Sequence, residues 1–182
     1  MLSVRDDRMR LQGKKIGIFV GPGFEDFEFW VPYMRMQEEG AEVTVIGSEA
    51  GETFASKHGC LTATSDVAAR DVKSDTLAGV IVPGGWCPDK IRRDPDVQRI
   101  VRETYEADRT VGLICHAGLV GISAGIVKGH RATGSEGIKD DLINAGATWV
   151  DEAAFVDGPI VWGRVVADIP AFCRLLVERL GA

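Results

Sequence analysis

The residues with the clearest capacity for chemistry are Cys115 and His116, in the stretch 111–124. Four apolar residues precede the cysteine, and small and apolar residues at helical spacing follow the histidine. This pattern predicts a buried parallel strand that turns sharply into a helix. A nucleophile on such a turn is held out of the sheet on a strained backbone, as a serine is in the hydrolase elbow. We therefore predict that Cys115 is a reactive thiol.

Two sources of positive charge are expected beside this thiol. The N-terminus of the following helix carries about half a positive charge, and His116 is a second possible source. Both would lower the pKa of Cys115 below the value of a free cysteine, about 8.5. The alternative is that Cys115 is a small buried hydrophobic residue, as most free cysteines are.

Length and composition limit what the rest of the chain can be. The 182 residues are 45% hydrophobic and carry a net charge of −6, which suits one globular domain and argues against nucleic acid or an anionic membrane as a partner. No apolar run approaches the ~20 residues of a membrane span. Residues 1–13 lack the apolar core of a secretory signal. We expect a flexible leader over 1–13, a single domain over 14–182 and a cytoplasmic location.

The other cysteines and histidines give no metal signal. The four cysteines are far apart, with no CxxC pair and no spacing typical of metal ligands: Cys60, Cys87, Cys115 and Cys173. Free thiols in a reducing compartment are the expectation. His58 and His130 lie in glycine-rich turns and are interpreted as solvated loop residues. We predict neither a metal nor a cofactor.

Strand and helix patterns alternate along the chain. Strands are expected at 14–20, 41–47, 79–82 and 111–114, and helices at 24–39, 94–107 and 167–180. Pro32 predicts a kink or an early end of the first helix. Asp94 is an expected N-cap with Pro95 at the first helical position. The alternation predicts a three-layer α/β/α sandwich with a mainly parallel central sheet.

In sheets of this kind, sites form where the carboxyl ends of the strands meet at a switch in strand order. Three loops are expected there, spanning Gly21–Glu25, Pro83–Asp89 and Cys115–Ala117. We predict that they converge around Cys115.

Five segments resemble the PfpI family of intracellular cysteine peptidases, within the ThiJ/PfpI superfamily. They occur in order and at compatible spacing across about residues 14 to 181: Gly23-Phe-Glu-Asp-Phe-Glu28, Val82-Pro-Gly-Gly85, Ile114-Cys-His-Ala-Gly118, Gly137-Ile-Lys-Asp-Asp141 and Asn144-Ala-Gly-Ala-Thr-Trp-Val-Asp151. Each segment alone is a weak signal, but five collinear ones are a strong signal. The resemblance implies a flavodoxin-like or class I glutamine amidotransferase-like fold and a homodimer or hexamer.

The resemblance also implies roles for individual residues. Cys115 would be the nucleophile, and Glu25 would be a protonated acid hydrogen-bonded to its sulfur. Backbone N–H groups of Gly85 and His116 would bind an oxyanion. His116 would be oriented by an acid from a neighbouring subunit, at the position of Asp89. Glu25 and Asp89 have alternatives as ordinary acidic residues at helix N-termini.

This chain departs from the family pattern at three places. Asp89 is shorter than the usual glutamate, which shifts its reach by roughly an ångström. Glu136 stands where close relatives often carry an aromatic residue, so it is a candidate substrate-binding residue. Ala117-Gly118 replaces the usual Gly-Pro. These changes leave the nucleophile in place and put the identity of the substrate in doubt.

The main hypothesis is a cofactor-independent cysteine hydrolase whose thiolate adds to a carbonyl. The resemblance covers peptidases, glyoxalases acting on 2-oxoaldehydes and deglycases acting on glycated groups, so the substrate is an aldehyde or a peptide. The alternative is a thiol sensor of oxidative stress, or a chaperone-like protein, in which Cys115 is oxidised. An isonitrile hydratase-like activity is less favoured by Glu25 in its Gly-Phe-Glu-Asp context. Glutamine amidotransferases need a downstream His-x-Glu, which the sequence lacks.

Overall fold

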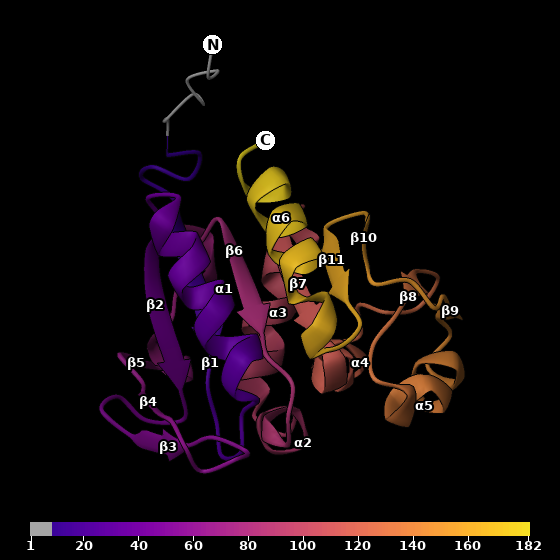
Figure 1. Cartoon of the computed structure of the whole chain (residues 1–182), viewed down its shortest axis with the longest axis horizontal. Helices are drawn as coiled ribbons and strands as arrows, with labels where there is room; N and C mark the ends of the chain where they lie inside the picture. The colour runs from indigo at the N-terminus through magenta and orange to yellow at the C-terminus, as the bar shows by residue number, and fades with distance from the viewer. Residues whose placement is uncertain (1–8) are drawn as a thin grey trace.

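The computed structural model describes residues 9–182 and contains a seven-stranded central sheet (Figure 1). In sheet order the strands are β10 (Ala154–Asp157), β11 (Ile160–Gly163), β7 (Thr110–Ile114), β6 (Gly79–Val82), β1 (Lys15–Phe19), β2 (Glu42–Gly47) and β5 (Val67–Ala68). All neighbours pair in parallel except β10 and β11, which form an antiparallel hairpin. The predicted, mainly parallel sheet is confirmed.

Helices cover both faces of this sheet, as the sandwich prediction requires (Figure 1). One face carries α1 (Asp26–Glu38) and α6 (Ile169–Leu180), and the other carries α3 (Pro95–Glu106) and α4 (Gly118–Ala124). The short α2 (Cys87–Ile91) lies against α4, and α5 (Lys139–Asn144) lies beyond it. Two small sheets pair β3 (Thr53–Ala55) with β4 (Thr62–Thr64), and β8 (Arg131–Ala132) with β9 (Thr148–Trp149). Short 3-10 turns span Ala69–Asp71, Ser74–Thr76, Cys115–Ala117, Glu136–Ile138 and Val166–Asp168.

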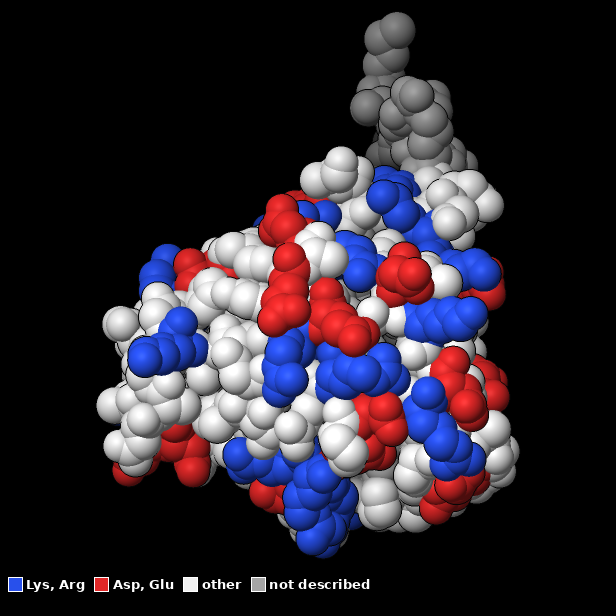
Figure 2. Space-filling view, turned by 180° about the vertical axis from the view of Figure 1, so that it is seen from behind, with Lys and Arg blue, Asp and Glu red and all other residues white. Residues whose placement is uncertain are grey.

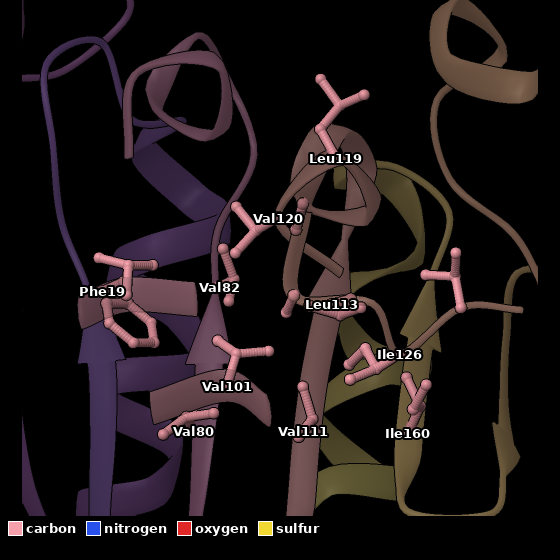
Figure 3. Close-up of a cluster of buried hydrophobic side chains, with 14 of the residues drawn as sticks. Phe19, Val80, Val82, Val101, Val111, Leu113, Leu119, Val120, Ile126 and Ile160 are labelled. Carbon is pink, nitrogen blue, oxygen red and sulfur yellow. The ribbon is translucent and has the colours of Figure 1, made fainter. Parts of the chain in front are cut away.

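The core forms two clusters because successive side chains of a strand point to opposite faces. Ile16 and Ile18 of β1 pack toward α1 and α6, whereas Phe19 lies in the cluster on the α3 side. Figure 3 shows that second cluster, in which side chains from β6 and β7 meet those of α3 and α4: Val80, Val82, Val111, Leu113, Val101 and Val120. Burial on both faces accounts for the continuous apolar runs of these strands.

The first helix is longer than its proline predicts. Pro32 lies inside α1, and the helix continues through it to Glu38, so the predicted early end is wrong. Proline removes only one backbone donor, and the side chain is buried where the helix packs.

Residues 1–8 of the expected leader lie outside the described residues. Leu11 is fully buried, and its N–H donates to the carbonyl of Glu39 at 2.8 Å.

The surface agrees with the mixed charge of the sequence. Acidic and basic side chains are interleaved on the face seen in Figure 2. Arg99 on α3 contacts both Asp96 and Glu103, which keeps these charges locally paired. Within residues 9–182, no helix has both the length and the apolarity that crossing a membrane demands.

Candidate active site

Cys115 lies on the sharp turn between β7 and α4. It is the first residue of the 3-10 turn Cys115–Ala117, and its backbone has φ 60°, in the left-handed region. A non-glycine residue adopts this conformation only when the surrounding structure enforces it, and such strain is concentrated at functional sites. The strained elbow expected from the sequence is therefore present.

The three loops meet at the carboxyl edge, because backbone hydrogen bonds join the first two and Gly84 of the second lies against Cys115. Phe24 and Gly85 form an isolated antiparallel bridge, and the N–H of Trp86 donates to the carbonyl of Gly23 at 2.8 Å. The carbonyl of Cys115 accepts a bond from the N–H of Ser135 at 3.3 Å. The predicted convergence is confirmed, and the loop after β8 joins it.

The acid beside the thiol is Glu28, which corrects the expected contact with Glu25. The Glu28 carboxylate and the Cys115 thiol lie side by side, since a Cβ on Gly84 would be within 3.1 Å of both, and Glu28 accepts a bond from the N–H of Gly84 at 2.9 Å. Glu25 precedes the helix in an extended conformation, so its carboxylate turns back as the N-cap of α1. It accepts bonds from the N–H groups of Phe27 and Glu28 at 2.8 and 2.9 Å.

The two glycines after β6 allow this close assembly. A Cβ on Gly84 would lie 2.7 Å from Cys115 Cβ and would also collide with the Glu28 carboxylate. Gly85 has φ 75°, and a Cβ there would lie 2.6 Å from the backbone nitrogen of Glu25. Any larger residue at either position would push the acid, the thiol and the bridging loop apart.

Burial changes the ionisation of both groups. Burial, and then the negative charge of Glu25, raises the pKa of Glu28 to about 7. Burial, and then the negative charge of Glu28, raises the pKa of Cys115 to about 12, opposed by the N–H groups of Gly85 and His116. The expected lowering of the Cys115 pKa by the helix terminus is therefore outweighed. Near pH 7 Cys115 is therefore a neutral thiol, and Glu28 carries its proton in about half of the molecules.

The oxyanion donors expected from the sequence lie at the sulfur. The backbone N–H groups of Gly85 and His116 both favour a negative charge on Cys115 Sγ and so oppose the rise of its pKa. A tetrahedral centre formed on that sulfur would place its oxygen near these donors, which is the geometry of an oxyanion hole. His116 lies in the first turn of the helical segment that starts at Cys115, so its backbone N–H has no intrahelical carbonyl to which it could donate.

The His116 imidazole lies beside the turn Glu136–Ile138. A Cβ on Gly137 would be 3.6 Å from His116 Nε2, and Glu136 is exposed next to it. His116 Nδ1 is buried and has no hydrogen-bond partner among residues 9–182. Asp89 is exposed on α2, and no hydrogen bond joins it to His116 within the described part of this chain.

The remaining candidates separate into packing and surface residues. Cys87 and Cys173 are buried, and Arg164 Nε pairs with Asp168 at 2.9 Å. His130 is partly buried and hydrogen-bonded through both ring nitrogens, so its interpretation as an exposed loop residue is wrong. His58 is exposed, 3.8 Å from a Glu25 oxygen.

Comparison with known proteins gives consistent matches over nearly the whole chain. Residues 14–179 match the DJ-1/PfpI family. A deglycase of Pyrococcus abyssi is 40% identical over 86% of this chain and 93% of its own. General stress protein 18 of Bacillus subtilis is 36% identical over 89% of this chain and 95% of its own.

A solved structure extends these matches to the fold. A two-domain protein from Anabaena variabilis, with DJ-1/ThiJ/PfpI-like and ferritin-like domains, superposes with a TM-score of 0.90 at 36% identity. The match covers 92% of this chain and 48% of that protein, so this chain spans about half of the two-domain protein.

Proposed function

Because this chain belongs to the DJ-1/PfpI family, we propose that it is a cysteine-dependent enzyme that acts on 2-oxoaldehydes and on the groups they glycate. The observation that carries the proposal is the setting of Cys115. The thiol sits on a left-handed backbone beside the Glu28 carboxyl group, and the backbone N–H groups of Gly85 and His116 favour negative charge on its sulfur. Similar proteins at about 40% identity are named deglycases.

The arrangement supports the following sequence of steps. The Glu28 carboxylate takes the thiol proton as Cys115 Sγ adds to the aldehyde carbon. The new oxyanion faces the N–H groups of Gly85 and His116 and then takes up that proton, which gives a hemithioacetal. From a glycated amine, the thiol displaces the free amine and gives the same hemithioacetal. His116 moves a proton from C1 to C2, which converts the hemithioacetal into a thioester. Water hydrolyses the thioester, so a 2-hydroxy acid leaves and the thiol is restored.

Assembly into a homo-oligomer would complete the site. His116 Nδ1 lacks a partner within the described residues, and an imidazole that shuttles protons works best when a second group fixes its tautomer. Asp89 of a second copy is the proposed group. Apolar side chains exposed along one stripe of α1, and on α2, fit such a contact: Phe27, Val31, Met34 and Trp86.

The first test measures consumption of methylglyoxal, of a methylglyoxal-glycated amine and of a small peptide panel. Wild type should consume the first two, and Cys115→Ser should lose about 10³-fold or more of that rate. Cys173→Ser, which changes a buried thiol on α6, is the matched control and should retain it. Turnover by Cys115→Ser at the wild-type rate would overturn the proposal, and turnover of peptides alone would make the chain a peptidase.

A mixing experiment tests the shared site. Cys115→Ser and Asp89→Ala should each be nearly inactive alone. After the two are unfolded and refolded together, a dimer should regain about a quarter of the wild-type rate, because half of the dimers are mixed and each has one complete site. No recovery in verified mixed oligomers would exclude Asp89 as the partner group.

A thiol sensor is the second candidate, favoured by the similarity to a general stress protein. The Glu28 carboxyl could donate a hydrogen bond to a Cys115 sulfinate as well as to a thiolate. Reduced protein without turnover that gains two oxygens on Cys115 under mild peroxide would establish this function in place of the enzyme.

A further inference from the structure

A second polar cluster lies on the outer side of the N-terminus of α1. It contains Glu25, Asp26 and His58, whose donor atoms all lie within 4.8 Å of one another. Glu25 and Asp26 are adjacent in the chain, whereas His58 comes from the turn between β3 and β4. The carboxylate beside the Cys115 sulfur is that of Glu28, which is not a member of this cluster.

Asp26 is the unusual member of the cluster. It is only 5% exposed, and its Oδ2 is buried with no hydrogen-bond partner among residues 9–182. A buried carboxylate without a donor or a counter-charge is strongly unfavourable. Asp26 Oδ2 therefore needs a cationic or hydrogen-bonding partner that residues 9–182 do not provide.

Glu25 and His58 leave donor atoms free at the same place. Glu25 Oε2 is used as the helix cap, whereas Glu25 Oε1 lies 3.8 Å from His58 Nε2. That separation is too long for a hydrogen bond. It is close to the ~3.3 Å between two ligands of a tetrahedral ion with bonds of ~2.0 Å.

We propose that Glu25, Asp26 and His58 bind a divalent transition-metal ion, for which Zn²⁺ is the best match. One imidazole nitrogen and two carboxylate oxygens are three protein ligands of Zn²⁺, and water takes the fourth position. The imidazole disfavours Ca²⁺ and Mg²⁺, which prefer oxygen. Two carboxylates outweigh the helix terminus, which carries about half a positive charge.

Backbone hydrogen bonds hold the turn that carries His58 close to Glu25 and Asp26. The N–H of Lys57 donates to the carbonyl of Phe24 at 2.7 Å, directly before Glu25. The N–H of Gly59 donates to the carbonyl of Ser56 at 3.1 Å and closes the turn that carries His58. An exposed imidazole on a turn anchored in this way needs only a side-chain rotation to close on the ion.

The test is calorimetric titration of Zn²⁺ into chelator-treated full-length protein carrying Cys115→Ala, which removes the reactive thiol as a competing ligand. One ion per chain is expected. His58→Ala and Asp26→Asn should each weaken binding at least tenfold. Lys57→Ala, at the neighbouring exposed position, is the matched control and should retain binding, or tighten it, because it removes a nearby cation.

Exposed Cys60 lies two residues from His58, so Cys60→Ser is measured too. Unchanged binding in Cys60→Ser, and a Co²⁺ complex without a thiolate charge-transfer band, support the site. Equal affinity in the Cys115→Ala parent and in the same protein with Asp26→Asn, or loss of binding in Cys60→Ser alone, would overturn it. The control for folding is the melting temperature without metal. Under that condition Asp26→Asn should be at least as stable as the parent. Zn²⁺ should raise the melting temperature of the parent and not that of Asp26→Asn.

Discussion

The molecule holds two histidines in contrasting surroundings, His116 at the carboxyl edge of the sheet and His130 beside α3. His130 Nε2 lies 2.7 Å from the Tyr105 hydroxyl, and its Nδ1 lies 2.8 Å from an Asp157 oxygen. The same Asp157 oxygen, Oδ2, also accepts a bond from the backbone N–H of Arg131 at 2.9 Å. His116 Nδ1 is buried without a partner among the described residues.

The difference separates a structural histidine from one available for chemistry. This network joins α3, the start of β8 and the β10–β11 hairpin, and both ring nitrogens of His130 are bonded. An unpaired buried nitrogen costs about 1–3 kcal/mol. At His116 this cost lies beside a strained thiol, which is where a substrate or a second subunit would supply the missing bond.

The largest predicted effect is on turnover after His116→Ala. Loss of a positioned proton carrier should lower the rate of methylglyoxal consumption by about 10²–10⁴-fold. The melting temperature should stay nearly unchanged, because the substitution removes an unsatisfied nitrogen. A variant with wild-type turnover would show that His116 takes no part in proton transfer, and the functional distinction from His130 would be lost.

Glu28→Gln is predicted to flatten the pH dependence of stability. The folded state raises the pKa of Glu28 to about 7, so the native protein binds the proton more tightly than the unfolded chain. This stabilisation is complete below the ordinary pKa of glutamate and is lost as the pH rises through about 7. With chelator present, wild type should lose about 2–3 kcal/mol more than Glu28→Gln between pH ~4.5 and ~8. Identical slopes in urea titrations of the two proteins would contradict the burial of Glu28.

Gly84→Ala should damage the same site through shape alone. The added methyl group would lie 2.7 Å from Cys115 Cβ, and overpacking of this kind costs about 1–3 kcal/mol. Thermal unfolding measures the loss. Gly137→Ala is the matched control, since its Cβ would make an ordinary contact 3.6 Å from His116 Nε2. Equal stability of the two variants would show that the site is looser than described.

The smallest effect is expected from His130→Ala. The substitution leaves Tyr105 and Asp157 without their partner and should lower the free energy of unfolding by about 1–2 kcal/mol. Turnover per folded molecule should remain that of wild type. A large loss of turnover with unchanged stability would remove the distinction between the two histidines.

Local patterns were sufficient to predict most of the fold. Asp94 and Pro95 placed the start of α3 correctly, and the apolar run before Cys115 identified a buried strand and its elbow. Local signals were insufficient at Pro32, where tertiary packing keeps the helix continuous. They also failed at His130, because Tyr105 and Asp157 are distant in the chain.

The prediction of Glu25 as the acid beside Cys115 was wrong, because Glu28 lies there. The family resemblance directed attention to Glu25, yet Glu28 lies one and two helical turns from Pro32 and Met36, on the buried side of α1. A carboxylate on the apolar stripe of a helix is the signal that would have identified it. The cluster with His58 had no such signal, because its spacing arises only from the folded hairpin.

Trapping the covalent intermediate tests most directly whether Cys115 is the nucleophile. Protein quenched with acid during methylglyoxal turnover would be digested, and its cysteine peptides would be weighed by mass spectrometry. We predict the mass of one added methylglyoxal on the peptide containing Cys115, absent from Cys115→Ser and from the peptide containing Cys173. Steady turnover with the adduct on another residue, or with no adduct under any quench time, would contradict the assignment of Cys115 as the nucleophile.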